Sequence, residues 1–312
     1  MEDRFNSLMA DASLSRYADD IRGLVRNSIR ITSQPASGSD FEIGQSRMGG
    51  LPDLPPGIEW PAWTPPVCPR KPSLLERLFS KQPAPLEEPK PSSHSFIAQF
   101  NLSEVAPYDT ERVLPDRGML YFFYDATSMV WFDDPPHGEG WRVIYWSGGA
   151  SQLTRTSAPE GLSQKLIYGA FRPTFTSERV FPPWESLLVE RLGMSQKEIY
   201  EYAEVIEKLS SNDSDRVSRL LGHPDYIQYT DMLTECQLAS NGIAAGDLSR
   251  LPDDPRIPGL LRGATEWQLL FQMDSQDMNT NWGDAGRIYY LTKSYDMTQQ
   301  SLDEVWLALQ CG

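Results

Sequence analysis

The sequence predicts an α+β fold that is internally duplicated, with two strand-rich halves whose antiparallel sheets are related by a pseudo-two-fold axis and with helices outside. The first observation is a succession of short aromatic and β-branched runs separated by turn residues, with helical stretches between them. The second is a set of similar segments that recurs along the chain. The length of 312 residues accommodates two domains or one large one.

Three pairs of similar segments occur in the same order along the chain, and their offsets are nearly equal. They are Phe96–Asn101 and Leu269–Asp274 at 173 residues, Gly118–Phe122 and Gly286–Tyr290 at 168, and Gly50–Asp53 and Gly222–Asp225 at 172. Ordered matches at one offset are hard to obtain by chance. We therefore interpret them as an internal duplication.

The chain divides into three predicted parts. Residues 1–30 form an N-terminal helix, because apolar residues recur there at steps of three and four. Residues 31–175 form the first repeat half, which carries a proline-rich insertion over residues 61–93. Residues 176–312 hold a helical segment and the second repeat half.

Aromatic and β-branched runs predict seven strands. They are expected at Ser28–Thr32, Phe96–Leu102, Gly118–Tyr124, Val130–Phe132, Trp141–Trp146, Trp267–Met273 and Arg287–Leu291. A helix is expected over Ser195–Leu209, with Glu198 at capping-box spacing, and a shorter one should end at Leu221–Gly222. The stretch Ser73–Phe79 is either a loop pinned by apolar residues or a partner-docking helix, and Ser301–Gln310 is either helix or strand.

Charge and composition restrict the function. The chain has 28 Lys and Arg against 43 Asp and Glu, a net charge of −15, which argues against electrostatic binding to nucleic acid or an anionic membrane. The N-terminus lacks the basic and apolar regions of a secretory signal, and no apolar run is long enough to cross a bilayer. Cys68, Cys236 and Cys311 have no metal or disulfide spacing. We therefore expect a cytoplasmic protein with free thiols.

Established catalytic and metal motifs are absent from the sequence, so no metal or cofactor is predicted. Its three histidines, His94, His137 and His223, lie far from one another and from any cysteine at ligand spacing. The acidic stretch Asp277–Asp284 resembles the start of a calcium loop, but its glycine falls one place late and Ile288 stands where a bidentate carboxylate is needed. A polar loop capped by its own Asx side chains is the alternative.

Six residues are candidates for ligand binding in a cleft between the two halves. They are Arg47, Gln99, Gln272, Asp274, Trp282 and Asp284. Gln99 and Gln272 each interrupt an apolar strand. Each buried amide therefore holds a backbone segment or a loop of the other half in place, or else the two form a ligand-binding pair at the junction of the halves. Asp274 and Asp284 are the carboxylate pair for acid–base chemistry. Arg47 either neutralises one of these carboxylates, holds an anionic ligand through its guanidinium, or is an internal clamp.

Several segments resemble the YwqG-like family of bacterial proteins, which are built around a domain of unknown function. The similar stretches are Ser46–Gly50, Trp60–Pro61, Phe96–Leu102, Gly118–Phe123, Leu220–Pro224, Trp267–Ser275 and Trp282–Gly286. The resemblance runs from about Ser46 to the C-terminus. It implies a duplicated α+β fold in a cytosolic protein and brings no established activity.

Two classes of function follow from these observations. The first is a non-catalytic interaction protein of the bacterial cytosol, of the immunity or adaptor type, because an acidic surface suits a basic protein partner. The alternative is a small-molecule-binding protein or enzyme with its site in the cleft between the repeat halves. The missing catalytic motifs favour the first class, although novel active sites carry no known motif.

Overall fold

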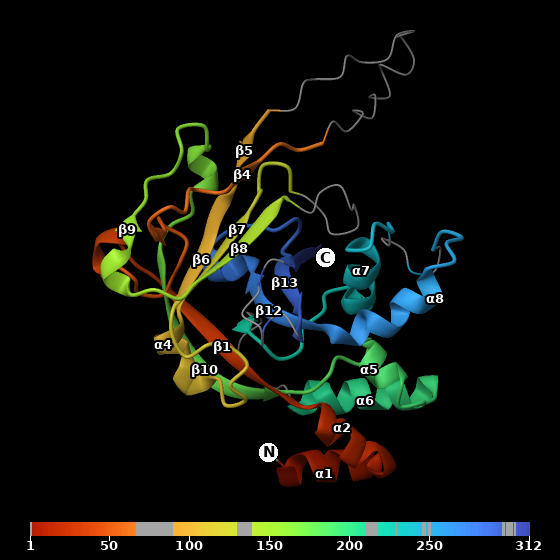
Figure 1. Cartoon of the computed structure of the whole chain (residues 1–312). Helices are drawn as coiled ribbons and strands as arrows, with labels where there is room; N and C mark the ends of the chain where they lie inside the picture. The colour runs from red at the N-terminus through yellow and green to blue at the C-terminus, as the bar shows by residue number, and fades with distance from the viewer. Residues whose placement is uncertain are drawn as a thin grey trace.

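The computed structural model describes residues 2–66, 90–129, 139–209, 217–228, 230–244, 248, 251–294, 297, 302 and 304–312. Within these ranges, ten strands form one antiparallel sheet that curves almost into a barrel (Figure 1). From edge to edge they are β14 (Val305–Gln310), β13 (Arg287–Lys293), β12 (Trp267–Asp274), β11 (Ser218–Leu220), β1 (Arg26–Pro35), β10 (Phe171–Val180), β2 (Arg47–Met48), β6 (Ser95–Asn101), β7 (Met119–Tyr124) and β8 (Trp141–Trp146).

Smaller elements surround this sheet. Two short ladders pair β3 (Asp53–Leu54) with β9 (Thr154–Arg155) and β4 (Ala62–Trp63) with β5 (Ser92–Ser93). The α-helices are α1 (Glu2–Asp11), α2 (Ala18–Leu24), α4 (Leu102–Val105), α5 (Leu187–Glu190), α6 (Gln196–Leu209), α7 (Met232–Ala239) and α8 (Ile257–Leu260). The 3₁₀ turns are η1 (Ser15–Tyr17), η2 (Gly38–Asp40), η3 (Ala106–Tyr108), η5 (Ala150–Gln152), η6 (Gln164–Leu166), η8 (Leu261–Glu266) and η9 (Ser275–Met278).

An aromatic cluster fills the interior of the curved sheet. The ring of Phe271 on β12 lies 5.1 Å from Phe100 on β6 and 4.7 Å from Phe122 on β7, measured between centroids. The hydroxyl of Tyr290 on β13 donates to the carbonyl of Phe123 at 3.2 Å. Strands far apart in the sheet order therefore pack against each other, and aromatic burial of this kind is a large contribution to stability.

The two edge strands meet through tryptophan side chains. The indole Nε1 of Trp141 on β8 donates to the carbonyl of Val305 on β14 at 2.7 Å, and its ring packs edge-on against Trp306 with centroids 5.0 Å apart. Side-chain contacts therefore join β8 to β14, the two edges that a flat sheet would hold far apart.

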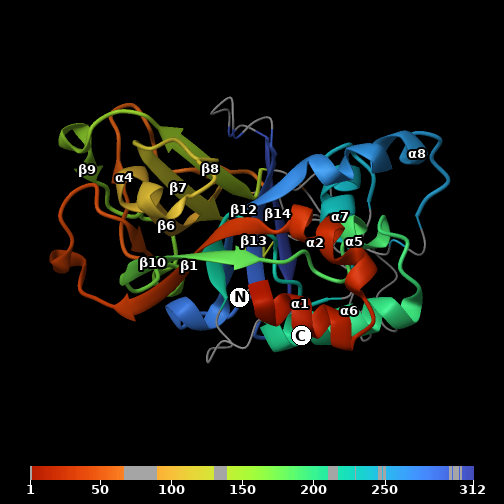
Figure 2. The same cartoon turned by 90° about the horizontal axis from the view of Figure 1, so that it is seen from below.

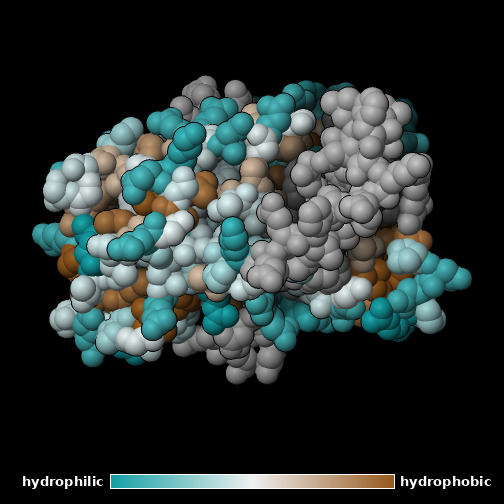
Figure 3. Space-filling model, turned by 90° about the horizontal axis from the view of Figure 1, so that it is seen from above, coloured by the Kyte–Doolittle hydropathy of each residue, from teal (hydrophilic) through white to brown (hydrophobic). Residues whose placement is uncertain are grey.

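Helices and loops cover the outer face of the sheet. Helix α1 lies beside α6 in both views of the ribbon (Figures 1 and 2), and Phe5 of α1 stacks on Phe181 with ring centroids 5.1 Å apart. Helix α7 packs Met232 and Cys236 against Trp267 at the start of β12. Strands such as β7 are consequently buried on both faces. On the face seen in Figure 3, hydrophobic areas are separated from one another by hydrophilic residues.

Most strands predicted from aromatic and β-branched runs are confirmed within a residue or two. The helix over Ser195–Leu209 is also confirmed, with its capping box: Ser195 N donates to Glu198 Oε2 at 2.8 Å, and Glu198 N donates to Ser195 Oγ at 3.4 Å. The segment Ser301–Gln310 forms a strand from Val305 onward. Ser73–Phe79 and Val130–Phe132 lie outside the described residues.

One predicted helix is wrong, and the predicted N-terminal helix is shorter and interrupted. The segment ending at Leu221–Gly222 is strand β11 and the turn after it, where both residues have positive φ; a Cβ at Gly222 would lie 2.7 Å from Ser28 Cβ. The single helix over residues 1–30 is broken where Ser13 adopts φ 60°, and it ends at Leu24, before β1. The expected boundary between residues 175 and 176 falls inside β10, which is continuous.

Along the described ranges, no helix combines the length and apolar character needed to cross a membrane.

Candidate functional site

The buried side chain of Gln99 binds the backbone on both sides of β2. Its Oε1 accepts from the backbone N–H of Asp53 at 2.7 Å, and its Nε2 donates to the carbonyl of Gln45 at 2.8 Å. Gln99 lies opposite Arg47 in the sheet, and the hydroxyl of Tyr121 donates to the carbonyl of Asp53 at 2.6 Å. We call Arg47, Asp53, Gln99 and Tyr121 the first glutamine site.

Charged groups close the first glutamine site. The Asp53 carboxylate, which is fully buried, pairs with Arg47 and accepts from Arg155 Nε at 2.6 Å. Burial lowers the pKa of Arg47 to about 10, although the neighbouring carboxylate of Asp53 opposes the shift. Arg47 is therefore an internal clamp rather than an open anion site.

The same contacts occur around Gln272. Its Oε1 accepts from the backbone N–H of Asp225 at 3.0 Å, and it lies opposite Arg219 in the sheet. Its Nε2 donates to the carbonyl of Val217, and the hydroxyl of Tyr289 donates to the carbonyl of Asp225 at 2.7 Å. We call Arg219, Asp225, Gln272 and Tyr289 the second glutamine site. Gln99 thus binds backbone within residues 31–175, and Gln272 binds backbone within residues 176–312.

The structure places the two glutamines apart. Four strands separate β6, which carries Gln99, from β12, which carries Gln272. Their neighbours Phe100 and Phe271 point into the barrel, so strand alternation directs both amides to the outer face. The six candidate residues therefore do not line one cleft between the halves.

The other candidates also separate. Asp274 is 3% exposed and accepts from Arg287 Nε at 2.7 Å, so Arg287 rather than Arg47 neutralises it. Asp284 is exposed on the loop before β13. Trp282 is buried in the core, with its ring 5.9 Å from Tyr124 by centroid. The pair proposed for acid–base chemistry thus combines one neutralised carboxylate with one exposed carboxylate.

The loop that resembles a calcium site caps its own turns. Asp274 Oδ1 accepts from the N–H of Gln276 at 2.9 Å, Asn281 Oδ1 accepts from the N–H of Ala285 at 3.0 Å, and Asn279 is left-handed with φ 50°. This is the Asx-capped alternative. Within the described ranges, no group of three or more His, Cys, Asp or Glu side chains is arranged to hold a metal ion.

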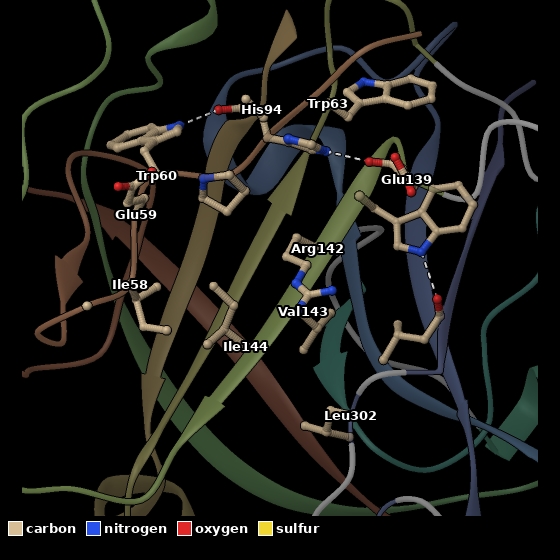
Figure 4. A pocket seen from close by; sticks show the side chains of 15 residues that line it. Ile58, Glu59, Trp60, Trp63, His94, Glu139, Arg142, Val143, Ile144 and Leu302 are labelled. Atoms are coloured by element: carbon tan, nitrogen blue, oxygen red, sulfur yellow. Dashed lines mark hydrogen bonds between the residues drawn. The ribbon is translucent and has the colours of Figure 1, made fainter. Parts of the chain in front are cut away.

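A hollow of about 590 Å³, which sequence reasoning missed, opens beside β4, β5 and β8 (Figure 4). We call it the tryptophan hollow because Trp60, Trp63 and Trp141 line it. Its other apolar lining residues include Ile58, Pro61, Val143, Ile144, Leu302 and Val305. Volume and lining are typical of a binding site for a small molecule or an inserted side chain.

Each indole N–H of the tryptophan hollow is already used. Trp60 Nε1 donates to the carbonyl of His94, and Trp63 Nε1 donates to Asp125 Oδ2, both at 2.7 Å. Trp141 Nε1 donates to Val305 as described above. Burial opposes ionisation of Asp125, but the hydrogen bonds it accepts, from Trp63 first, lower its pKa. The rings are thereby held in place and offer apolar surface rather than donors.

The polar groups of the hollow come from different segments. Glu59 and Glu139 are exposed carboxylates at its border, and Arg142 on β8 lies between the tryptophans and Leu302 (Figure 4). His94 is 2% exposed; its Nε2 bonds the carbonyl of Glu139 at 2.9 Å, and within the described part of the chain its Nδ1 has no hydrogen-bond partner. Burial lowers the pKa of His94, so its ring is neutral at pH 7. Glu59, Glu139 and Arg142 together therefore give the hollow one excess negative charge.

The sequence held only a weak signal for the hollow. Trp60 and Trp63 stand in a proline-rich stretch that argued for a loop, and Trp141 opens a strand about eighty residues later. The neighbouring strands β6, β7 and β8 bring these segments together, and the approach of β14 to β8 adds Leu302 and Val305.

A family model described as a domain of unknown function (DUF1963) matches residues 46–311, and the chain therefore belongs to this family. The matched range includes both glutamine sites and the tryptophan hollow. A comparison with curated proteins finds no match.

Proposed function

We propose that the protein acts by binding, without catalysis, and that its tryptophan hollow receives a basic side chain of a protein partner. The observation that carries the proposal is the chemistry of the hollow: tryptophan rings whose N–H groups are already used, bordered by Glu59 and Glu139. Aromatic faces and carboxylates together favour a cation with several donors, such as a guanidinium. The excess negative charge of the chain supports the same class of partner.

A matched pair of peptides tests this proposal. A short arginine-containing peptide should bind and change the tryptophan fluorescence. Its citrulline counterpart, which is similar in shape but uncharged, should bind at least about tenfold more weakly. Binding should also weaken as salt rises, because exposed charges are screened. Equal affinity for both peptides would contradict the proposal.

Variants locate the binding site. Glu59→Gln combined with Glu139→Gln should weaken binding of the arginine peptide about tenfold, because both border carboxylates lose their charge. The control combines Glu160→Gln with Glu207→Gln, which changes the net charge equally at exposed positions outside the hollow. If the control weakens binding as much as the border variant, the effect is general electrostatics and the hollow is not the site.

We also propose that the two glutamine sites descend from an internal duplication with exchanged first strands. The first copy would comprise β1, β2, β6, β7 and β8, and the second β10 to β14. Strand β1 pairs Ile29 with Leu220 of the second copy, while β10 pairs Phe171 with Met48 of the first. Both exchanged strands lie at the centre of the sheet, beside the pseudo-two-fold axis that this proposal implies.

Equivalent substitutions test the duplication. Tyr121→Phe and Tyr289→Phe each remove one hydrogen bond to the carbonyl of Asp53 or Asp225. Each should lower the free energy of unfolding by about 1 kcal/mol. Denaturant titration would contradict the equivalence if the two costs differed by more than about 2 kcal/mol.

Within the wider family, we place the chain with the YwqG-like proteins. We also propose a cytoplasmic location, which the free thiols of Cys236 and Cys311 support.

A further inference from the structure

A second cavity, of about 380 Å³, borders the second glutamine site. Strand β10 supplies Glu178, and β11 supplies the buried Arg219. Trp184 and Ile206 form part of the apolar wall. We call it the arginine cavity. It shares no lining residue with the tryptophan hollow.

The two glutamine sites differ in what their arginines bind. Arg47 Nη1 donates to the carbonyl of Leu51 at 3.0 Å, and its guanidinium is also paired with the buried carboxylate of Asp53. At the first site, an internal carboxylate therefore occupies the position in front of the arginine.

At the second site the matching carboxylate, that of Asp225, points away from the arginine. Arg219 Nη1 donates to the carbonyl of His223 at 3.4 Å, as Arg47 does to Leu51, but Asp225 pairs with Arg287 and its side chain is 42% exposed. Among the described residues, the carboxylate nearest to Arg219 is that of Glu178, 3.5 Å from its Nε. Arg219 thus borders a cavity, whereas Arg47, at the matching position of the first site, is paired with a carboxylate.

Both members of this contact retain hydrogen-bonding capacity. Arg219 Nε and Glu178 Oε1 form an ion pair at 3.5 Å, but among the described residues neither atom has a hydrogen-bond partner, and Arg219 is only 7% exposed. Arg30 Nε donates to the other oxygen of Glu178 at 2.9 Å and so orients it. Buried polar groups without partners are costly, so a ligand that supplied both an acceptor and a donor would be stabilised here.

We propose that the arginine cavity binds a small zwitterion with an apolar side chain, of the α-amino acid class. The ligand carboxylate accepts from Arg219, in the role that Asp53 has at the first site, and the ligand ammonium donates to Glu178. Trp184 and Ile206 contact the ligand side chain. The lining arginines and carboxylates are equal in number, which suits a ligand without net charge better than a simple anion.

A ligand series on the wild-type protein tests this proposal by isothermal titration calorimetry. L-phenylalanine should bind at least about tenfold more tightly than phenethylamine, which lacks the carboxylate, and than 3-phenylpropionate, which lacks the ammonium. L-leucine and L-tryptophan test the size of the apolar part. The proposal is overturned if none of the three amino acids binds, or if 3-phenylpropionate binds as tightly as L-phenylalanine.

Two variants assign the contacts. Glu178→Gln should abolish the preference for L-phenylalanine over 3-phenylpropionate, and Arg219→Gln should abolish the preference for it over phenethylamine. The control, Glu59→Gln with Glu139→Gln, should bind L-phenylalanine like the wild type, which separates this cavity from the tryptophan hollow. If Arg219→Gln fails to fold, Glu178→Gln decides: an unchanged preference in that variant refutes the assignment.

Discussion

Lowering the pH from 7 to 4 should destabilise the protein through His223. This side chain is 7% exposed, and its Nε2–H donates to the carbonyl of Leu24 at 2.7 Å. Burial, reinforced by the charges of Arg26 and Arg219, lowers its pKa from 6.5 to about 4, although the hydrogen bond to Leu24 opposes the shift. Its imidazole is therefore neutral in the folded protein at pH 7.

The size of the effect follows from the difference in pKa between the unfolded and folded states. Between pH 6.5 and about 4, His223 binds a proton in the unfolded chain but not in the folded one. Stability therefore falls with falling pH, and the contribution is fully present only above pH 6.5. With about 1.4 kcal/mol for each pKa unit, His223 alone should lower the free energy of unfolding by about 3 kcal/mol across this window.

Urea denaturation of the wild type and His223→Gln, followed by circular dichroism at pH 7, 6, 5 and 4, measures this contribution. Glutamine can still donate to the Leu24 carbonyl but does not titrate. The loss of stability between pH 7 and 4 should therefore be about 3 kcal/mol smaller in the variant, while carboxylates and His94 contribute to both proteins and cancel. Equal losses in the two proteins would show that His223 is protonated, or free to reach water, in the folded state.

Three further outcomes are expected. Asp53→Asn should cost about 3–5 kcal/mol in denaturant titration, because it leaves the Arg47 charge buried without a carboxylate, whereas Asp225→Asn should cost much less since Asp225 is 42% exposed. Phe271→Ala should lower the free energy of unfolding by about 3–5 kcal/mol by opening a cavity in the aromatic core. Millimolar calcium should leave the melting temperature unchanged, because the Asx side chains after Asp274 already cap their own turns; a shift in melting temperature would contradict that interpretation.

The strands that sequence patterns predicted are those in which burial and β-propensity agree. Strand β7 consists of Met119–Tyr124, all buried, and its aromatic run is visible in the sequence. The sequence pattern does not predict strand β10, because this strand contains Pro173 and six charged or hydroxyl side chains, four of them exposed. Its ten-residue pairing with β1 supplies the stability that its composition does not suggest.

The turn after β11 shows why local signals misled. Glycine followed by proline is typical of a helix end, and Gly222 with Pro224 matches that pattern. The glycine is instead required because the turn passes within contact distance of Ser28 on β1, a neighbour 194 positions earlier in the sequence. No local pattern reports a contact of that kind.

The glutamines show how far sequence reasoning reached toward function. An amide that interrupts an apolar strand predicts a hydrogen-bonded structural role, and Gln99 and Gln272 each bind the backbone of the segment after the neighbouring strand. What the sequence could not indicate is the direction of the two carboxylates, because Asp53 and Asp225 occupy matching positions in similar motifs. Asp53 turns inward to Arg47, whereas Asp225 turns outward to Arg287. The arginine of the first glutamine site is therefore paired with a carboxylate, and the arginine of the second site borders a cavity. That difference depends on Arg287, which stands where the first segment has Met119, and on Glu178, which lies outside the matched segments.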